Sequence, residues 1–330
     1  MKRFNLLFEM LVFCSMVAFT GCVDAQSNYP TKPIRLIVGF GAGGATDVIA
    51  RFYGQKWSEI LKTPIVVDNK PGGSQLIGIK TVLAAPKDGY TLFFGTGSAF
   101  SQGPGVRTDL PYAPLKDFTL IGMVSSAPGV IIVAPKLPVA GLRELVDYSK
   151  QNPSKLNYGS SGLGSASHLQ TEYMMYITGM KMTHIPYKSA ADIIRELSVG
   201  AVHVGITPIE STMSQITSGR IRALAVTGTR RSKALPNVPS VSESGIKGLE
   251  GIDPYTYYAL AGPIGLPAGV VSKLSETMDQ VSKSPIIAAQ VREQLFNEPG
   301  ISTPSSFRKF IEADLQKWKQ LRGTVKVTED

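Results

Sequence analysis

Short apolar runs alternate with amphipathic stretches of helical period along the chain, which is the pattern of layered α/β proteins. Strands are predicted at residues 34–38, 64–67, 91–95, 130–134, 156–158, 183–186, 202–207 and 223–227. Helices are predicted at residues 47–61, 76–84, 141–151, 168–178, 190–199, 270–282, 285–295 and 304–321. A chain of 330 residues with this alternation is long enough for two domains of ordinary size.

The N-terminus has the layout of an export signal. Lys2 and Arg3 precede an apolar stretch at residues 10–19, and small residues follow. That stretch is too short to span a bilayer, which takes about 20 apolar residues. We favour cleavage after Ala25, which makes residues 1–25 the signal, but the sequence around Cys22 also fits a lipoprotein anchor. Both alternatives predict a periplasmic protein.

The composition limits the kinds of site and ligand that we expect. Both cysteines, Cys14 and Cys22, lie in or at the edge of the signal, so we expect no disulfide and no thiolate metal site in the mature chain. His168, His184 and His203 match no metal-binding spacing. The formal net charge of +9 favours an acidic ligand, but the basic residues are dispersed and do not form a nucleic-acid motif. We therefore expect no metal, no cofactor and no nucleic acid.

Two glycine-rich loops, at residues 39–47 and 158–169, each join a predicted strand to a predicted helix. Glycine lets backbone N–H groups crowd around a ligand, and the start of the following helix adds its positive dipole end. Both loops are therefore predicted to hold an anion.

The first loop also allows an enzymatic interpretation. Gly39, Gly41 and Gly44 form a G-x-G-x-x-G pattern after a strand, and Asp68 ends the next strand at the distance of a ribose-binding acid. This alternative is an NAD(P)-dependent oxidoreductase. An export signal without a twin-arginine pair argues against this enzyme. Asp68 is also followed directly by the turn sequence 69–73, and an aspartate at that place is explained by the turn.

The second loop contains Ser160, Ser161, Ser165 and His168 within nine positions, which suggests a hydrolase. The nucleophile elbow needs G-x-S-x-G, however, and Leu163 breaks it at the last position. Ser165 and Ser167 are candidate helix N-caps, which gives His168 a capping or packing role rather than that of a general base. Several hydroxyls and N–H groups in one loop suit carboxylate binding better than bond cleavage.

Motifs that lie in a fixed order along the chain are Pro33-Ile-Arg-Leu-Ile-Val38, Gly43-Gly44 with Asp47 and Arg51, Asn69-Lys-Pro-Gly-Gly73, Asp88-Gly-Tyr-Thr-Leu92, Tyr158-Gly-Ser-Ser-Gly-Leu-Gly-Ser165 with His168-Leu169, His184-Ile-Pro-Tyr-Lys188, Gly219-Arg-Ile-Arg-Ala-Leu-Ala-Val226, Leu235-Pro-Asn-Val-Pro239 and Pro263-Ile-Gly-Leu-Pro267. Together they resemble the Bug family (UPF0065), the extracytoplasmic solute receptors of tripartite tricarboxylate transporters. The resemblance covers essentially the whole mature chain.

The resemblance implies an α/β, two-lobed periplasmic-binding architecture of type II-like form, with a two-strand hinge and a ligand cleft between the lobes. The crossings would be residues 118–126 and 251–260. Lobe 1 would comprise residues 26–124 and 251–330, and lobe 2 residues 125–250. Such a protein is a monomeric receptor, not an enzyme. It would capture a small organic carboxylate (a di- or tricarboxylate or an aromatic acid) and deliver it to the membrane subunits of the transporter.

Ligand contacts are expected from both loops and from places where the chain departs from the family pattern. In the first loop, Gly39, Gly41 and Ala42 replace a proline-rich segment, and Thr46 is expected to cap the helix while facing the cleft. Thr207 stands where an aspartate is common, which argues against an amino-acid ligand. The expected contacts are Phe40, Ala42, Gly43, Gly44, Thr46, Thr96, Ser98, Ser161, Gly162, Gly164, Ser165 and Thr207.

Overall fold

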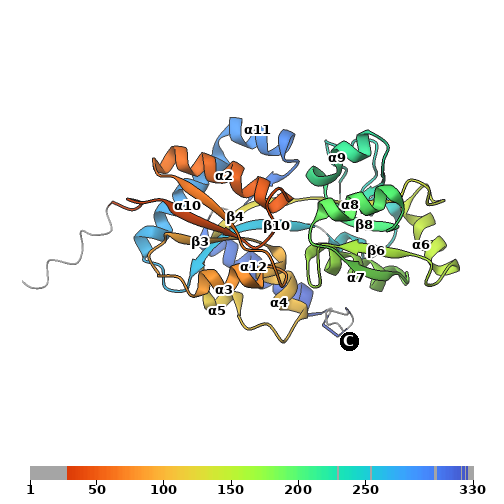
Figure 1. Cartoon of the computed structure of the whole chain (residues 1–330), viewed down its shortest axis with the longest axis horizontal. Coiled ribbons are helices and arrows are strands. Elements are labelled where there is room, and N and C mark those ends of the chain that lie inside the picture. The colour runs from red at the N-terminus through yellow and green to blue at the C-terminus, as the bar shows by residue number, and fades with distance from the viewer. Residues whose placement is uncertain are drawn as a thin grey trace, which may run out of the picture.

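The structure is a computed structural model that describes residues 28–228, 230–252, 255–300, 303–320, 322–323 and 325. The predicted signal at residues 1–25 and the alternative anchor Cys22 lie outside the described residues. Two separate β-sheets, each covered by helices, form two lobes that lie side by side (Figure 1). No helix in the described part of the chain has the length and apolar character that crossing a membrane requires.

The first lobe is built on a six-stranded sheet with the order β11-β4-β10-β3-β1-β2. Strands β1, β2 and β3 are parallel, whereas β10 is antiparallel to β3 and β4, and β11 is antiparallel to β4. Their bounds are β1 Ile34–Val38, β2 Ile65–Asn69, β3 Thr91–Thr96, β4 Phe118–Ala127, β10 Thr256–Pro263 and β11 Glu298–Pro299. The helices are α2 Ala45–Leu61, α3 Leu76–Leu83, the π-helix η2 Ser98–Gln102, α4 Gly103–Val106, α5 Pro114–Asp117, α10 Ala268–Lys283, α11 Pro285–Gln294 and α12 Pro304–Lys319.

The second lobe is built on a five-stranded sheet with the order β7-β6-β8-β5-β9. Its strands are β5 Gly129–Val133, β6 Asn157–Ser160, β7 Thr183–Pro186, β8 Val204–Pro208 and β9 Arg222–Val226. Its helices are α6 Leu142–Gln151, α7 Ala166–Thr178, α8 Ala190–Val199, α9 Ile209–Thr217 and the 3-10 turns η3 Val241–Ser244 and η4 Leu249–Ile252. Helix α9 and the π-helix η2 are absent from the sequence-based prediction.

Each sheet has its own apolar core. Helix α2 shows how the pattern of the sequence produces this packing, because Ile49, Tyr53, Trp57 and Leu61 recur every four residues and are all buried. They pack in one cluster with residues of β1, β3 and β10. Burying one such side chain contributes about 1.5–3 kcal/mol, so the packing fixes the direction in which α2 points its N-terminus.

Two adjacent strands connect the lobes. β4 belongs to the first sheet up to Ala127, and after Pro128 the chain continues as β5 of the second sheet. β10 returns beside β4, with Thr256 opposite Ala127, and both strands lie in the middle of the molecule (Figure 1). The lobe boundaries at 124/125 and 250/251 stay a prediction. The first lies within β4 and the second a few residues before β10, so each falls in a segment that passes from one lobe to the other.

The lobes also meet along one side of the connection. Val106 of α4 and Trp318 of α12 form a buried apolar cluster with Leu169 of α7 and with Val325. This contact keeps the start of α7 close to the first lobe.

Candidate ligand-binding site

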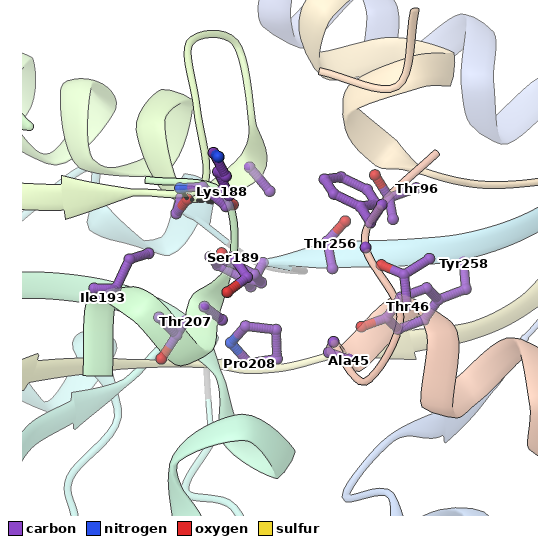
Figure 2. Close-up of a pocket in the computed structure, with 18 residues that line it drawn as sticks. Ala45, Thr46, Thr96, Lys188, Ser189, Ile193, Thr207, Pro208, Thr256 and Tyr258 are labelled. Atoms are coloured by element: carbon purple, nitrogen blue, oxygen red, sulfur yellow. Dashed lines mark hydrogen bonds between the residues drawn. The ribbon is translucent and has the colours of Figure 1, made fainter. Parts of the chain in front are cut away.

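A pocket lies between the two lobes, with an empty volume of about 600 Å³ when its open mouth is counted. From the first lobe and the crossing strand it is lined by Phe40, Gly41, Gly44, Ala45, Thr46, Thr96, Thr256 and Tyr258. From the second lobe it is lined by Ser161, Ala166, Ser167, Lys188, Ser189, Ala190, Ile193, Thr207 and Pro208, with Tyr255 just before β10. Figure 2 shows Thr46, Thr96 and Tyr258 on one side, Ser189, Ile193 and Thr207 on the other, and Thr256 between them.

Three helices begin at this pocket. The lining includes the first residues of α2, α7 and α8, namely Ala45, Ala166 and Ala190. The first N–H groups of a helix have no partner within the helix, and its N-terminus carries a partial positive charge. Lys188 adds a full positive charge, and none of the described residues that line the pocket is an aspartate or glutamate. The electrostatics of the site therefore favour an anion.

The first glycine loop is held by Asp47. Its carboxylate accepts hydrogen bonds from the Gly43 N–H (2.9 Å), Arg51 Nε (2.9 Å) and Asn69 Nδ2 (3.0 Å). Burial alone would raise the pKa of Asp47, but the hydrogen bonds from Arg51, Gly43 and Asn69 hold that pKa below its ordinary value. Asn69 also donates to the Phe40 carbonyl at 3.0 Å. Asp47 and Asn69 therefore hold the loop in place, and the Gly43 N–H is used for this bond to Asp47.

One detail of this loop corrects the sequence analysis. Gly44 is the N-cap of α2, and no side chain of the described residues caps that helix. Thr46 lies inside the first turn and lines the pocket, so it faces the cleft as expected without capping the helix. A glycine N-cap keeps this part of the wall free of side chains, and Gly43 has the positive φ (79°) that favours glycine.

The second glycine loop satisfies its own backbone. The Ser161 N–H donates to Ser167 Oγ (2.9 Å), and the Gly164 N–H donates to His168 Nδ1 (3.1 Å). Ser165 caps α7 by accepting the His168 N–H at 3.3 Å, as expected for this residue. Ser161 and Ser167 line the pocket, and their Oγ atoms lie 3.0 Å apart.

The rings of Tyr158, His184 and His168 pack against one another next to the second loop. The His168 and His184 rings lie 4.3 Å apart, and Tyr158 stacks on His184 at 4.9 Å. Ser160 Oγ lies 2.5 Å from His184 Nε2. Burial lowers the pKa of His168 to about 3, with a further contribution from His184, and burial lowers the pKa of His184 to about 4. His168 is 1% exposed, which fits the predicted packing role.

Six of the twelve expected contact residues line the pocket: Phe40, Gly44, Thr46, Thr96, Ser161 and Thr207. The other six, which do not line it, are Ala42, Gly43, Ser98, Gly162, Gly164 and Ser165. Ser98 is buried and accepts from Gln75 Nε2 at 2.7 Å, and Gly162 and Gly164 supply the positive φ that shapes the second loop. Direct contact of any of the twelve with a ligand stays a prediction.

Helix α8 and the two residues before it contribute to the pocket, which was not predicted from the sequence. Lys188, Ser189 and Ala190 line the pocket, and Ser189 caps the helix by accepting the Asp192 N–H at 3.3 Å. A signal was present, since Ser189-x-x-Asp192 is a helix-start pattern.

Two hydroxyls in the lining have no hydrogen-bond partner among the described residues. Thr207 Oγ1 and Thr256 Oγ1 are buried and make no hydrogen bond to the described residues. A buried polar atom without a partner costs about 1–3 kcal/mol. A ligand or water that supplies polar atoms to this part of the pocket would recover that free energy.

Asp68, the acid of the dinucleotide alternative, lies within β2 and not in the following loop, which corrects the explanation given from its sequence context. Its carboxylate accepts from Arg35 Nε on the neighbouring strand at 2.8 Å, and Lys70 lies 3.5 Å away. Asp68 does not line the pocket. The arrangement explains Asp68 as a cross-strand ion pair.

The two sheets, the paired crossing strands and the pocket between the lobes define a two-lobed periplasmic-binding-protein architecture. Residues 49–326 match the family described as tripartite tricarboxylate transporter family receptor. The chain belongs to this family, as its resemblance to Bug proteins predicted. Receptors of this family are periplasmic solute-binding proteins and not enzymes.

Individual relatives are similar to this chain over nearly their full lengths. A UPF0065 protein of Bordetella pertussis is 32% identical over 320 residues, which cover 96% of each chain. Among solved structures, R. palustris Rpa4515 with adipate has a TM-score of 0.83 and 32% identity, covering 90% of this chain and 98% of that one. The periplasmic binding protein BugD has a TM-score of 0.81 and 30% identity, covering 92% and 100%.

Proposed function

We propose that this protein captures a small organic carboxylate in the periplasm and delivers it to the membrane subunits of a tripartite tricarboxylate transporter. The observation that carries the proposal is the convergence of three helix N-termini, from both lobes, on one pocket whose described lining contains a lysine and no acidic side chain. A ligand held from both lobes would also link binding to the relative position of the lobes.

In the proposed complex, one carboxylate lies between the starts of α2 and α7. It accepts hydrogen bonds from unpaired first-turn N–H groups and from the hydroxyls of Ser161 and Ser167. A second acidic group of the ligand would face Lys188 and the start of α8, so we favour a dicarboxylate. The adipate in Rpa4515, a relative with 32% identity, supports this choice.

The oxidoreductase alternative rests on the G-x-G-x-x-G spacing and on Asp68 as the ribose-binding acid. Asp68 is engaged by Arg35, and the family to which the chain belongs consists of receptors. We therefore propose that the protein itself has no enzymatic activity and needs no cofactor. Millimolar NAD should give no binding isotherm.

A thermal-shift screen tests the function. The purified protein without residues 1–25 would be heated with adipate, malate, citrate, benzoate, hexanoate or NAD. A ligand at 100 times its Kd stabilises the folded state by about 2.7 kcal/mol, which is a shift of several degrees. We expect dicarboxylates to stabilise the protein more than hexanoate, and Lys188→Met to remove that preference. Stabilisation by NAD alone would overturn the proposal.

Delivery to a transporter needs a separate experiment. Deletion of the gene should abolish uptake of the acid that binds in the screen, and a plasmid copy should restore it. Normal uptake after deletion would assign the protein to sensing. Light scattering of the purified protein should give the mass of a monomer.

A further inference from the structure

Glu210 is an acidic residue that no part of the proposed binding scheme uses. It lies in the first turn of α9, in the second lobe. Its Oε1 accepts a hydrogen bond from the Tyr258 hydroxyl at 3.1 Å. Tyr258 belongs to β10 of the first sheet and lines the pocket. The bond therefore ties a pocket-lining side chain of one lobe to a helix of the other.

The other carboxyl oxygen has no such partner. Glu210 Oε2 is buried and makes no hydrogen bond to the described residues, although part of the side chain reaches the surface. Burial raises the pKa of Glu210 to about 7, while its own backbone N–H and the Tyr258 hydroxyl oppose the rise. Tyr255 also lies within electrostatic range. None of the described groups acting on this carboxyl is a cation.

A buried carboxylate without a cation is unfavourable, whereas a neutral carboxylic acid still accepts from Tyr258. We propose that Glu210 is a positioning residue that, in its protonated form, holds Tyr258 in the pocket wall across the junction of the lobes. Ionisation would draw the carboxyl toward water and release Tyr258. The proposal rests on the proposed function only where it concerns ligand affinity.

The sign of the pH effect follows from linkage. Between the unfolded pKa of about 4.5 and the folded pKa of about 7, the folded protein holds a proton that the unfolded chain has lost. The contribution of Glu210 to stability therefore falls as pH rises through this window and is level above it. If the open form exposes Glu210, affinity for a ligand that needs the closed form falls in the same window.

The test compares wild type with Glu210→Gln, which keeps the acceptor and the size of the side chain but cannot ionise. Urea unfolding from about pH 4.5 to about pH 8 should show wild type matching Glu210→Gln at the acid end and losing stability relative to it as pH rises. Infrared spectra should contain a protonated-carboxyl band that fades near neutral pH and is absent from the variant. Glu293→Gln, at an exposed glutamate of α11, is the matched control and should follow wild type.

Adipate is the probe for the binding step. Above about pH 6, where both carboxyl groups of adipate are ionised, its Kd for wild type should rise by up to tenfold per pH unit until about pH 7. Over the same range the Kd for Glu210→Gln should be flat. Tyr258→Phe removes the bond to Glu210 and should weaken adipate binding most where Glu210 is protonated, with a smaller difference from wild type above about pH 7. Identical pH profiles for wild type and Glu210→Gln, in both unfolding and binding, would overturn the proposal. If adipate fails to bind at any pH, it is excluded as the ligand, and the unfolding comparison still decides the role of Glu210.

Discussion

Ser165 and Ser167 lie two positions apart at the start of α7, both are buried, and their Oγ atoms lie 3.0 Å apart. Their roles nevertheless differ, because Ser165 caps the helix, whereas Ser167 lines the pocket and accepts the Ser161 N–H. A side-chain cap contributes about 1 kcal/mol to stability, and a hydrogen bond to a charged group contributes about 1.5–3 kcal/mol. The two hydroxyls should therefore be separable by experiment.

We expect Ser167→Ala to weaken binding of the acid identified in the screen about tenfold or more, because 1.4 kcal/mol corresponds to a factor of about ten. Ser165→Ala should instead lower the free energy of unfolding by about 1 kcal/mol and leave the Kd within a few-fold. Calorimetry and urea unfolding of both variants provide the measurements. The reverse result would move the ligand contact from Ser167 to Ser165, as the sequence analysis first placed it.

At the scale of elements, the sequence predicts most strands and helices because apolar spacing and turn residues agree there. Strand β1 and helix α8 match their predicted ranges. The π-helix η2 was missed because Ser98–Gln102 runs into Gly103, Pro104 and Gly105, which have the composition of a loop. Tertiary contacts hold it, including the hydrogen bond from the Tyr112 hydroxyl to the Ala99 carbonyl at 2.8 Å.

Helix α9 was also missed, although Ile209, Met213 and Ile216 have helical spacing. Polar residues between them and the preceding Pro208 hid the signal. Pocket residues were predicted where a glycine motif marked them, as in Gly44 and Ser161. Tyr258 and Thr256 carry no local motif, because a strand brings them to the pocket from a distant part of the chain.

Asp47 holds the first glycine loop against the start of helix α2. Asp47→Ala removes the hydrogen bond from Gly43 in the loop, those from Arg51 of α2 and Asn69 of β2, and a negative charge from the first turn of α2. We expect faster hydrogen exchange at residues 39–47 and at least roughly tenfold weaker binding, with the rest of the lobe still protected.

Asp68→Ala is the matched control for Asp47→Ala. It removes an ion pair between β1 and β2, and Asp68 does not line the pocket. The affinity of this variant for the same acid should equal that of wild type. A loss of binding as large as that of Asp47→Ala would show that the loss of a negative charge from this lobe, and not the loss of the hydrogen bonds of Asp47, weakens the site.

At the scale of the whole molecule, the two-lobed arrangement was predicted only through the family resemblance. The local pattern around Phe118–Ala127 indicates a strand but does not say that its two ends serve different sheets. Gly129 begins the next strand after a single proline, so no long linker marks the change of lobe. β4 pairs with β10, which lies far along the chain, and a local sequence pattern does not indicate such long-range pairing.

Two buried histidines should make the folded protein less stable in acid. His168 and His184 have folded pKa values of about 3 and about 4, below the ordinary value of 6.5. As pH falls below 6.5, the unfolded chain binds protons that the folded chain does not, so stability is lost by up to about 1.4 kcal/mol per pH unit for each histidine. His168→Asn keeps an acceptor for the Gly164 N–H and should lose less stability than wild type between about pH 6 and about pH 4.

This slope is opposite in sign to the one assigned to Glu210, and the two windows overlap between about pH 4.5 and about pH 6.5. Two histidines outweigh one glutamate, so wild type should gain stability as pH rises through the overlap. In His168→Asn, His184 opposes Glu210, and His203, whose pKa is also lowered by burial, acts in the same direction as His184. The profile of this variant should therefore rise less steeply than that of wild type. Adding Glu210→Gln removes the opposing group and should steepen the rise again. Urea unfolding of the single and double variants measures these slopes, and a double variant no steeper than His168→Asn would contradict the role given to Glu210.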